Sequence, residues 1–351
     1  MRRKRLVALA SLTLILVVVV WYTPLTTHAK VLLLLSQELP QSPVKPLGLL
    51  TPEPIHAQRQ LQSPHGPVVA DLFLPAARFG RPQPRRRPAV ILALGVKLAE
   101  ERDRPILLGF ARTLARLGFV VLWPRLEALD AGAALPEEPD TFVAGIRFLE
   151  GLDLVDGERI SLLGFSVGAS TALVAASDPQ VAARVHGVIF FGGYYDLFAY
   201  LLSVATSSTV LDGQISTWQP HEQVVNRTRE MLQAKGADGV LRIFDATGRD
   251  EAESRLESAP AAELAALRRL DPAAHVAGVR ARLFILHDRG DVFVPYVESI
   301  KLRRALPQGS EKAFLLTGLF EHAQPKGGVS WQVVQDVARL YGFVYAALAF
   351  L

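Results

Sequence analysis

Short apolar runs alternate with longer segments of helical spacing from Val68 to the end of the chain. The runs are rich in Val, Ile, Leu and Phe, as strands buried on both faces are, and lie at 68–74, 89–94, 119–123, 160–163, 187–191, 282–286 and 313–316. The clearest helical spacing lies between and after them, at 104–117, 140–150 and 329–350. This alternation predicts an α/β fold, a mostly parallel central sheet with helices on both faces.

The alternation fails between about residues 200 and 270. This stretch of mixed helical and polar sequence separates two predicted strands and is too long for a connection without structure of its own. We therefore expect an inserted cap that roofs the site of the domain. Trp218 and Phe244 are its candidate substrate contacts, although both fit the cap's own core better.

The N-terminus predicts a membrane-directed segment. Four cations at positions 2–5 precede an uninterrupted apolar run over 6–22, which as a helix would be roughly 25 Å long, the short end of a transmembrane helix. Cations before the run favour a cytoplasmic N-terminus. We expect a signal anchor within 1–29 that holds the rest of the chain on the extracytoplasmic side of the membrane. The alternative is a signal peptide, cleaved near the small-x-small site at 27–29, and a secreted protein.

Prolines recur between residues 36 and 67 without sustained periodicity. Proline fixes φ and removes a backbone donor, so residues 30–67 are predicted to form an extended stalk. The folded domain is then expected over 68–351, with the cap inserted in it.

Composition narrows the possible functions. The chain carries 38 Lys and Arg against 34 Asp and Glu, and its net charge of +4 equals the four cations at positions 2–5. The remainder is formally neutral, which argues against nucleic acid as a partner. No cysteine occurs among the 351 residues, so disulfides, thiolate metal sites and cysteine nucleophiles are excluded. Metal-ligand spacing, G-x-G-x-x-G and P-loop patterns are missing from the sequence, so we expect neither a metal nor a cofactor.

Ser166 is the candidate nucleophile. It lies in Gly164-Phe165-Ser166-Val167-Gly168, between a predicted strand and a helix of small residues. A tight strand-to-helix turn exposes the hydroxyl but crowds the backbone, so small residues are needed two positions to either side. The same turn places the Val167 N–H at a helix N-terminus, where it can bind an anionic oxygen.

With this motif the sequence resembles the α/β-hydrolase superfamily, in its dienelactone-hydrolase-like and prolyl-oligopeptidase-like esterase branches. Residues 155–160, which lead into the Ser166 motif, look like the nucleophile region of those families. Residues 70–75 resemble their entry strand, and 118–124 a later strand. The resemblance covers roughly residues 68–351 but does not extend to the cap between about 200 and 270.

The resemblance implies a Ser-Asp-His catalytic triad. Residues 283–295 match the acid loop, and Asp291 occupies the position of the acid; Asp288 is the second candidate and Asp196 a distant third. His322, on a loop after the last predicted strand, occupies the position of the base.

An oxyanion hole is also implied, formed by the backbone N–H groups of Val167 and Val96. The second position departs from the family, which often has His-Gly where this chain has Leu94-Gly95.

These features predict a serine hydrolase that cleaves a small-molecule carboxylic ester through an acyl-enzyme on Ser166. Two alternatives stay open. One is a catalytically silent, membrane-tethered binding module on the same fold. The other keeps catalysis but acts on a peptide or another acyl bond.

Overall fold

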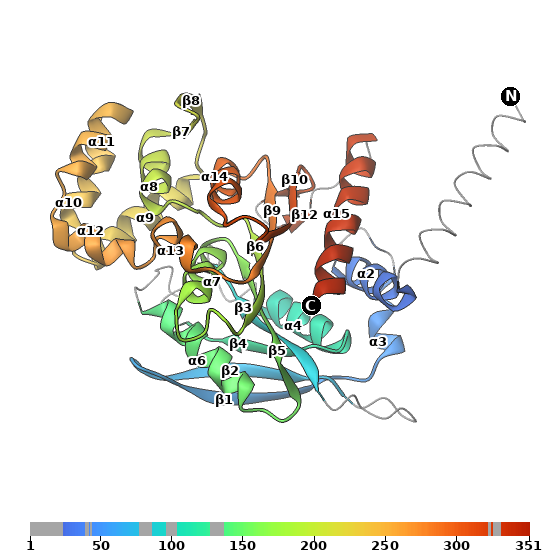
Figure 1. The fold of residues 1–351 in the computed structure, drawn as a ribbon. Coiled ribbons are helices and arrows are strands. Elements are labelled where there is room, and N and C mark those ends of the chain that lie inside the picture. Colours follow the sequence, from blue (N-terminus) through green and yellow to red (C-terminus); the bar gives the residue numbers. More distant parts are fainter. Residues whose placement is uncertain are drawn as a thin grey trace, which may run out of the picture.

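The protein is described from a computed structural model, which covers residues 24–38, 42, 44–76, 86–95, 104–126, 137–321, 324–325 and 331–351. Its centre is an eight-stranded sheet with the strand order β1-β2-β4-β3-β5-β6-β9-β10 (Figure 1). The strands are β1 (Ile55–Ser63), β2 (Gly66–Leu74), β3 (Arg87–Ala93), β4 (Val120–Pro124), β5 (Val155–Phe165), β6 (Val185–Phe191), β9 (Arg282–Asp288) and β10 (Glu311–Thr317). From β4 to β10 all neighbours are parallel, whereas β1 and β2 are antiparallel. The predicted α/β class is confirmed.

Helices cover both faces of the sheet, and the central strands are apolar in both directions. In β3, Ile91 faces one hydrophobic core together with α6 (Glu138–Glu150), α7 (Val167–Ser177) and α14 (Val297–Ala305). Its neighbour Val90 faces the other core, formed with α4 (Arg104–Arg116) and α15 (Trp331–Phe350). Burial on both faces explains why these strands read as continuous apolar runs.

The structure corrects the predicted stalk and the domain boundary near Val68. Residues 25–38 form α2 (Leu25–Glu38), which packs on α15, and Leu47–Leu50 form the short α3. Residues 55–63 are β1, which pairs with β2 along its whole length. The sheet therefore begins at Ile55. The sequence pattern missed this strand because an antiparallel strand at the edge of a sheet can expose most of its side chains.

The N-terminal run over 6–22 lies outside the described residues. In the part of the chain that is described, no helix has the length and apolar character needed to cross a membrane.

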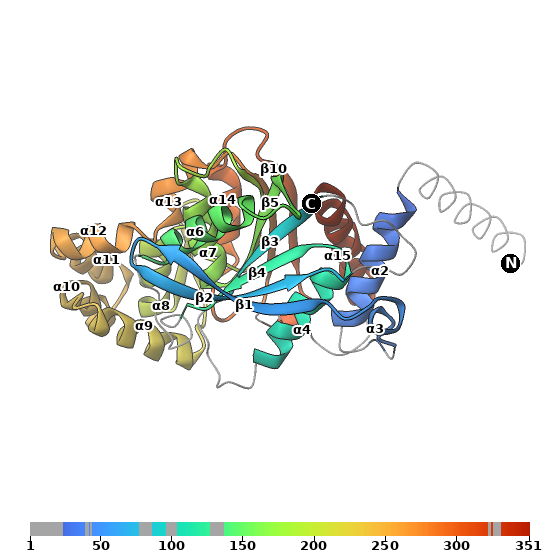
Figure 2. The same ribbon diagram turned by 90° about the horizontal axis from the view of Figure 1, so that it is seen from below.

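The predicted cap is present between β6 and β9. It contains α8 (Leu197–Thr206), the hairpin β7–β8 (Ser208–Leu211 and Gln214–Thr217), α9 (Glu222–Ala234), α10 (Asp238–Leu241), α11 (Arg249–Glu257) and α12 (Ala261–Arg268). These elements share a hydrophobic core of their own, and α13 (Pro272–His275) leads back to the sheet. The cap lies at the end of the molecule opposite α2 and α3 (Figures 1 and 2).

Candidate active site

Ser166 occupies a strained turn between β5 and α7. Its φ of 53° and ψ of −133° are rarely adopted by a residue with a side chain, and such strain collects at functional positions. The turn is held on both sides: the Ser166 N–H donates to the carbonyl of Phe191 at 2.8 Å, and Ala169 N–H donates to the Ser166 carbonyl at 2.9 Å.

The small residues around Ser166 are required by contact. A Cβ on Gly164 would lie 2.3 Å from Ala169 Cα, and one on Gly168 would lie 2.4 Å from the carbonyl oxygen of Ala93. A Cβ on Gly95 would lie 2.7 Å from Ser166 Cβ and 3.3 Å from Ser166 Oγ. The retained glycine at 95 therefore lies directly against the candidate nucleophile. Val167 is the first residue of α7, as predicted, and Val96 lies outside the described residues.

Asp291 lies in the loop that follows β9, and its carboxylate is buried. Oδ1 accepts the N–H of Phe293 at 2.7 Å and that of Val294 at 3.1 Å. Oδ2 lies 3.5 Å from the point where a Cβ on Gly192 would stand. Gly192 follows Phe191, whose carbonyl accepts the Ser166 N–H, so Asp291 and Ser166 both contact the end of β6.

The other two acid candidates have structural partners. Asp288 Oδ1 accepts Gly290 N–H and Oδ2 accepts Phe320 N–H, both at 2.8 Å, so this carboxylate ties the acid loop to the segment that leads toward residue 322. Asp196 caps α8 by accepting the Ala199 N–H at 2.9 Å. His322 itself lies outside the described residues.

His287, in strand β9, supports the acid loop from the side of the sheet. Its Nε2 lies 3.0 Å from the Val294 carbonyl and 3.5 Å from Asp291 Oδ2, and its Nδ1 lies 2.6 Å from Ser299 Oγ. A carbonyl can only accept, so Nε2 carries a proton and donates to Val294. The fully buried ring is a structural support of this loop.

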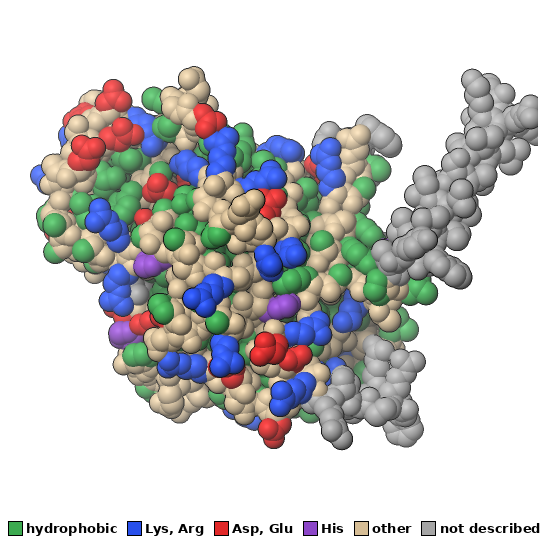
Figure 3. Space-filling model, viewed as in Figure 1, with side chains coloured by type: hydrophobic (Ala, Val, Ile, Leu, Met, Phe, Trp, Pro, Cys, Tyr) green, Lys and Arg blue, Asp and Glu red, His purple; other side chains and the backbone are tan. Residues whose placement is uncertain are grey.

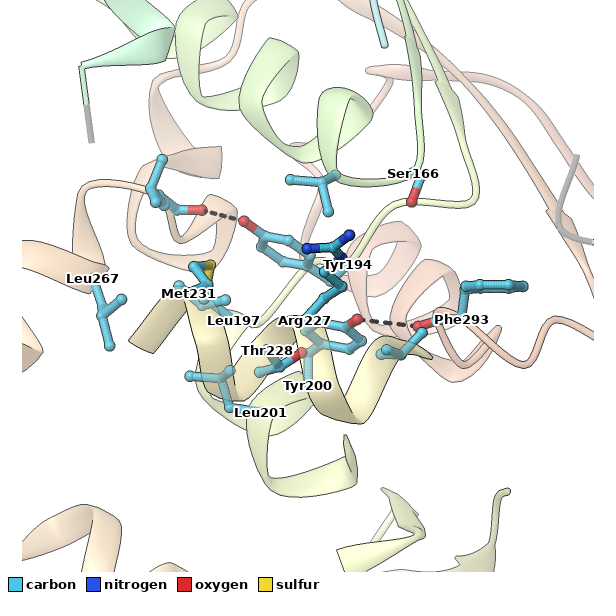
Figure 4. Close-up of a pocket in the computed structure, with 13 residues that line it drawn as sticks. Ser166, Tyr194, Leu197, Tyr200, Leu201, Arg227, Thr228, Met231, Leu267 and Phe293 are labelled. Atoms are coloured by element: carbon cyan, nitrogen blue, oxygen red, sulfur yellow. Dashed lines mark hydrogen bonds between the residues drawn. The ribbon is translucent and has the colours of Figure 1, made fainter. Parts of the chain in front are cut away.

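Three groups of the cap donate hydrogen bonds to backbone carbonyls of the acid loop. Trp218 Nε1 donates to the Asp291 carbonyl at 2.9 Å, and the His221 N–H donates to the Val292 carbonyl at 2.8 Å. The Tyr200 hydroxyl donates to the Phe293 carbonyl at 3.1 Å (Figure 4). Burial raises the pKa of Tyr200 well above its ordinary value, with a further rise from Asp291, so the hydroxyl stays a donor. No sequence motif pointed to these contacts.

A pocket of about 70 Å³ opens beside Ser166, room for on the order of five water molecules. Figure 4 shows Ser166 at one end, with Tyr194, Phe293 and residues of the cap around the rest. Its lining is mainly apolar and aromatic: Ser166, Val167, Tyr194, Leu197, Tyr200, Leu201, Val224, Arg227, Thr228, Met231, Leu267, Leu270 and Phe293. Trp218 and Phe244 do not line it and pack against the core of the cap. Within the described residues, no cluster of His, Asp and Glu could hold a metal ion.

Buried carboxylates join the cap to the sheet domain behind this pocket. Glu298 accepts the N–H groups of Tyr195 and Asp196 at 3.1 and 2.8 Å, and burial raises its pKa. Asp271 accepts the Leu197 N–H at 2.9 Å, and burial raises its pKa to about 6. The start of α8 is thus fixed from both sides.

Comparisons with known proteins give a fold. No family model matches the chain, and no curated protein matches it either. Solved structures do: a puromycin-hydrolyzing peptidase of Mycobacterium tuberculosis (TM-score 0.51, 17% identity) and dipeptidyl peptidase 4 of Porphyromonas gingivalis (0.52, 14%) each match over 84% of this chain. A 2,6-dihydroxy-pseudo-oxynicotine hydrolase matches over the same share, with a TM-score of 0.51 and 16% identity.

The matched part is 38%, 35% and 68%, respectively, of those three proteins, so this chain corresponds to less than half of the two peptidases. The chain therefore has the α/β-hydrolase fold, and its solved structural neighbours are of the prolyl-oligopeptidase-like and dienelactone-hydrolase-like kind that the sequence resembles.

Proposed function

We propose that the protein is a serine hydrolase that cleaves a carboxylic ester through an acyl-enzyme on Ser166. The observation that carries the proposal is the strained turn at Ser166, which opens on a mostly apolar pocket. A buried carboxylate, Asp291, lies beside Gly192, the neighbour of the residue that accepts the Ser166 N–H. An inert serine needs none of these three features.

Acylation follows from these roles. His322 takes the proton of the Ser166 hydroxyl as Oγ attacks the ester carbonyl. The oxygen of the tetrahedral intermediate becomes an anion, which the Val167 N–H binds together with that of Val96. The carbon–oxygen ester bond then breaks, His322 gives its proton to the leaving alcohol, and the acyl group stays on Ser166.

Deacylation repeats the same steps with water. His322 takes a proton from water, the resulting hydroxide attacks the acyl carbon, and Ser166 regains its proton as the carboxylic acid leaves. Asp291 accepts a hydrogen bond from the imidazole of His322 in this scheme and stabilises the imidazolium.

The pocket favours a compact apolar group on the substrate. Its volume of about 70 Å³ suits a short acyl or alcohol group, and its aromatic rings come from the segment after β6, the cap and the acid loop. Peptide or another acyl bond is the second candidate, because two of the structural neighbours are named as peptidases.

A fluorophosphonate probe tests the proposal. We expect the wild-type protein and Ser177→Ala to be labelled and Ser166→Ala to stay unlabelled; Ser177 is a matched serine at the other end of α7. A panel of p-nitrophenyl esters of increasing acyl length, beside peptide p-nitroanilides, then separates the two bond types. A folded wild-type protein that never labels would favour the silent binding module.

We also propose that the apolar run over 6–22 tethers the domain to a membrane, with the domain on the extracytoplasmic side. The support is the sequence: four cations, the apolar run and aromatic residues at its end. Extraction of membranes with alkaline carbonate and sequencing of the mature N-terminus distinguish a retained anchor from a cleaved signal peptide.

A further inference from the structure

Exposed hydrophobic side chains concentrate near the N-terminal end of the described chain. Of the ten large hydrophobic residues that are exposed in the described part, six fall within residues 25–55. They are Leu25, Leu32, Val44, Leu49, Leu50 and Ile55, and we call them the N-terminal patch. Leu49 is the extreme, with 88% of its surface exposed. Hydrophobic side chains gather in this region of the surface (Figure 3). Exposed hydrophobic side chains that gather in one region of a protein mark an interaction surface.

Helix α2 has an apolar outer face that the fold does not cover. Leu25, Ala29 and Leu32 share one side of the helix and are exposed, whereas Val31 is completely buried. The one lysine of the helix is Lys30, whose Nζ lies 5.1 Å from the centre of the Phe119 ring. Its charge therefore lies against the domain and not on the outer face of the helix. A surface helix of a soluble protein would carry charges on this face.

The helix is firmly attached to the domain. His28 bonds to the hydroxyl of Tyr341 on α15 and packs 4.6 Å from the Tyr345 ring, measured between ring centres. Val334 and Val337, two further exposed residues, lie on the same stripe of α15 as Tyr341. The outer face is therefore a fixed part of the surface, and α15 extends it.

The course of the chain identifies what covers this face. The apolar run over 6–22 ends two residues before α2 begins. At about 3.5 Å per residue, a chain that leaves a bilayer at Tyr22 brings Leu25 within roughly 10 Å of the membrane surface. Side chains there meet the boundary between headgroups and acyl chains, which accepts Leu, Val and Ile.

We propose that the N-terminal patch and the outer face of α2 lie against the lipid bilayer, an inference that rests on the proposed tether. The membrane contact then fixes the orientation of the domain relative to the bilayer. The cap lies at the opposite end from α2 and α3 (Figures 1 and 2), so the pocket beside Ser166, which cap residues line, is placed on the side of the domain away from the membrane. The substrate is taken from the aqueous phase rather than from the bilayer.

Single-cysteine labelling tests this contact, because the natural chain has no cysteine. The full-length protein is reconstituted into phosphatidylcholine–phosphatidylglycerol vesicles as Leu32→Cys, Leu49→Cys and Ile215→Cys and labelled with a polarity-sensitive fluorophore. Ile215 is the matched control: it is 62% exposed, against 60% for Leu32, but lies in the cap hairpin. We expect blue-shifted emission and several-fold stronger quenching by doxyl-labelled lipid at 32 and 49 than at 215.

Three results would overturn the proposal, and each is distinct. Equal quenching at 49 and 215 means that the patch faces water. Blue-shifted emission at 49 that increases with protein concentration in detergent, without lipid, means that a second copy covers the patch. Release of the unlabelled protein by alkaline carbonate means that the tether itself is missing. Ester hydrolysis, measured on all three variants, reports separately on the proposed function and is expected to equal the wild type.

Discussion

At the scale of single residues, the candidate site depends on glycines that let the backbone approach itself. Ser166 keeps its strained φ because the chain on either side of it is bonded to β6 and α7. The turn has no room for added atoms, since the contacts around Gly164 are backbone atoms that cannot swing aside. Sequence reasoning reached this point correctly, because the requirement is local: five consecutive residues define it.

Gly164→Ala tests the turn. Its Cβ would force Ala169 away and displace Ser166, and a misplacement of about 1 Å costs on the order of 10²-fold in rate. We expect at least that loss in the rate of probe labelling. Gly157→Ala is the control on the same strand, where a Cβ meets no atom within 4 Å. Similar labelling rates for the two variants would show that the turn tolerates the change.

Gly95→Ala tests the approach to the nucleophile more directly. The added methyl group would press on Ser166 Cβ and lie 3.3 Å from Oγ. Gly95 lies in the loop after β3 and not within the strand. We therefore expect kcat for ester hydrolysis to fall by about tenfold or more, a transition-state loss of about 1.4 kcal/mol, while the thermal midpoint changes little. A drop in the thermal midpoint with kcat unchanged would contradict this assignment.

Asp271 predicts a pH dependence of stability. Folding raises its pKa from 3.8 to about 6, so the folded state binds the proton more tightly. The corresponding stabilisation is complete below about pH 4 and is lost as the pH rises through 6, to a limit of about 3 kcal/mol. Asp271→Asn keeps an acceptor for the Leu197 N–H but cannot ionise.

We expect denaturant midpoints of the wild type to fall, relative to those of Asp271→Asn, between pH 4.5 and 7.5. Asp271→Ala removes the acceptor as well and should be destabilised at both pH values. Parallel pH profiles for the wild type and Asp271→Asn would refute the raised pKa.

At the scale of elements, the parallel strands were predictable and the first strand was not. The inner strands β3, β4, β6 and β9 and the second half of β5 are buried on both faces, so their sequences are continuous apolar runs. β1 lies at the edge, where most of its side chains are exposed and only Leu61 is buried. A polar side chain of β1 helps to hold it against β2: His56 lies 2.8 Å from Asp71 Oδ1 in a hydrogen bond and stacks on the ring of Phe73. A polar edge strand gives no periodic signal strong enough to separate it from a stalk.

The cap was predicted as an inserted element, but its second role was not. The sequence suggested a roof, whereas Trp218, His221 and Tyr200 also hold the backbone of the acid loop. These bonds join segments about 70 to 90 residues apart in the chain, so no local motif records them.

Trp218→Phe tests this second role. It keeps an aromatic ring in the core of the cap but removes the donor to the Asp291 carbonyl. One hydrogen bond contributes about 1 kcal/mol, so we expect kcat to fall about fivefold with little change in KM. Phe244→Leu is the control, because it perturbs the same core without a contact to the acid loop. If the two variants lose activity equally, the cap acts only as a roof.

At the scale of the whole molecule, the N-terminal segment is part of the folded unit. Val31 and Leu47 belong to the core that α4 and α15 share, and Leu61 belongs to the core on the other face. All three are at most 1% exposed. Burial of one such side chain contributes about 1.5–3 kcal/mol, so the three contribute roughly 5–9 kcal/mol, comparable with the whole unfolding free energy of a domain.

A truncation at residue 68 is therefore expected to fail where one at residue 24 succeeds. Without residues 24–67, β2 loses its partner along the register from Val68 to Leu74 and presents an open edge that can pair with other molecules. We expect the fragment 68–351 to aggregate or to lack a cooperative thermal transition in mild detergent, whereas 24–351 unfolds cooperatively and is labelled by the fluorophosphonate probe. Equal thermal midpoints and equal labelling of the two fragments would mean that β1 and α2 are accessories, and the boundary near Val68 would stand after all.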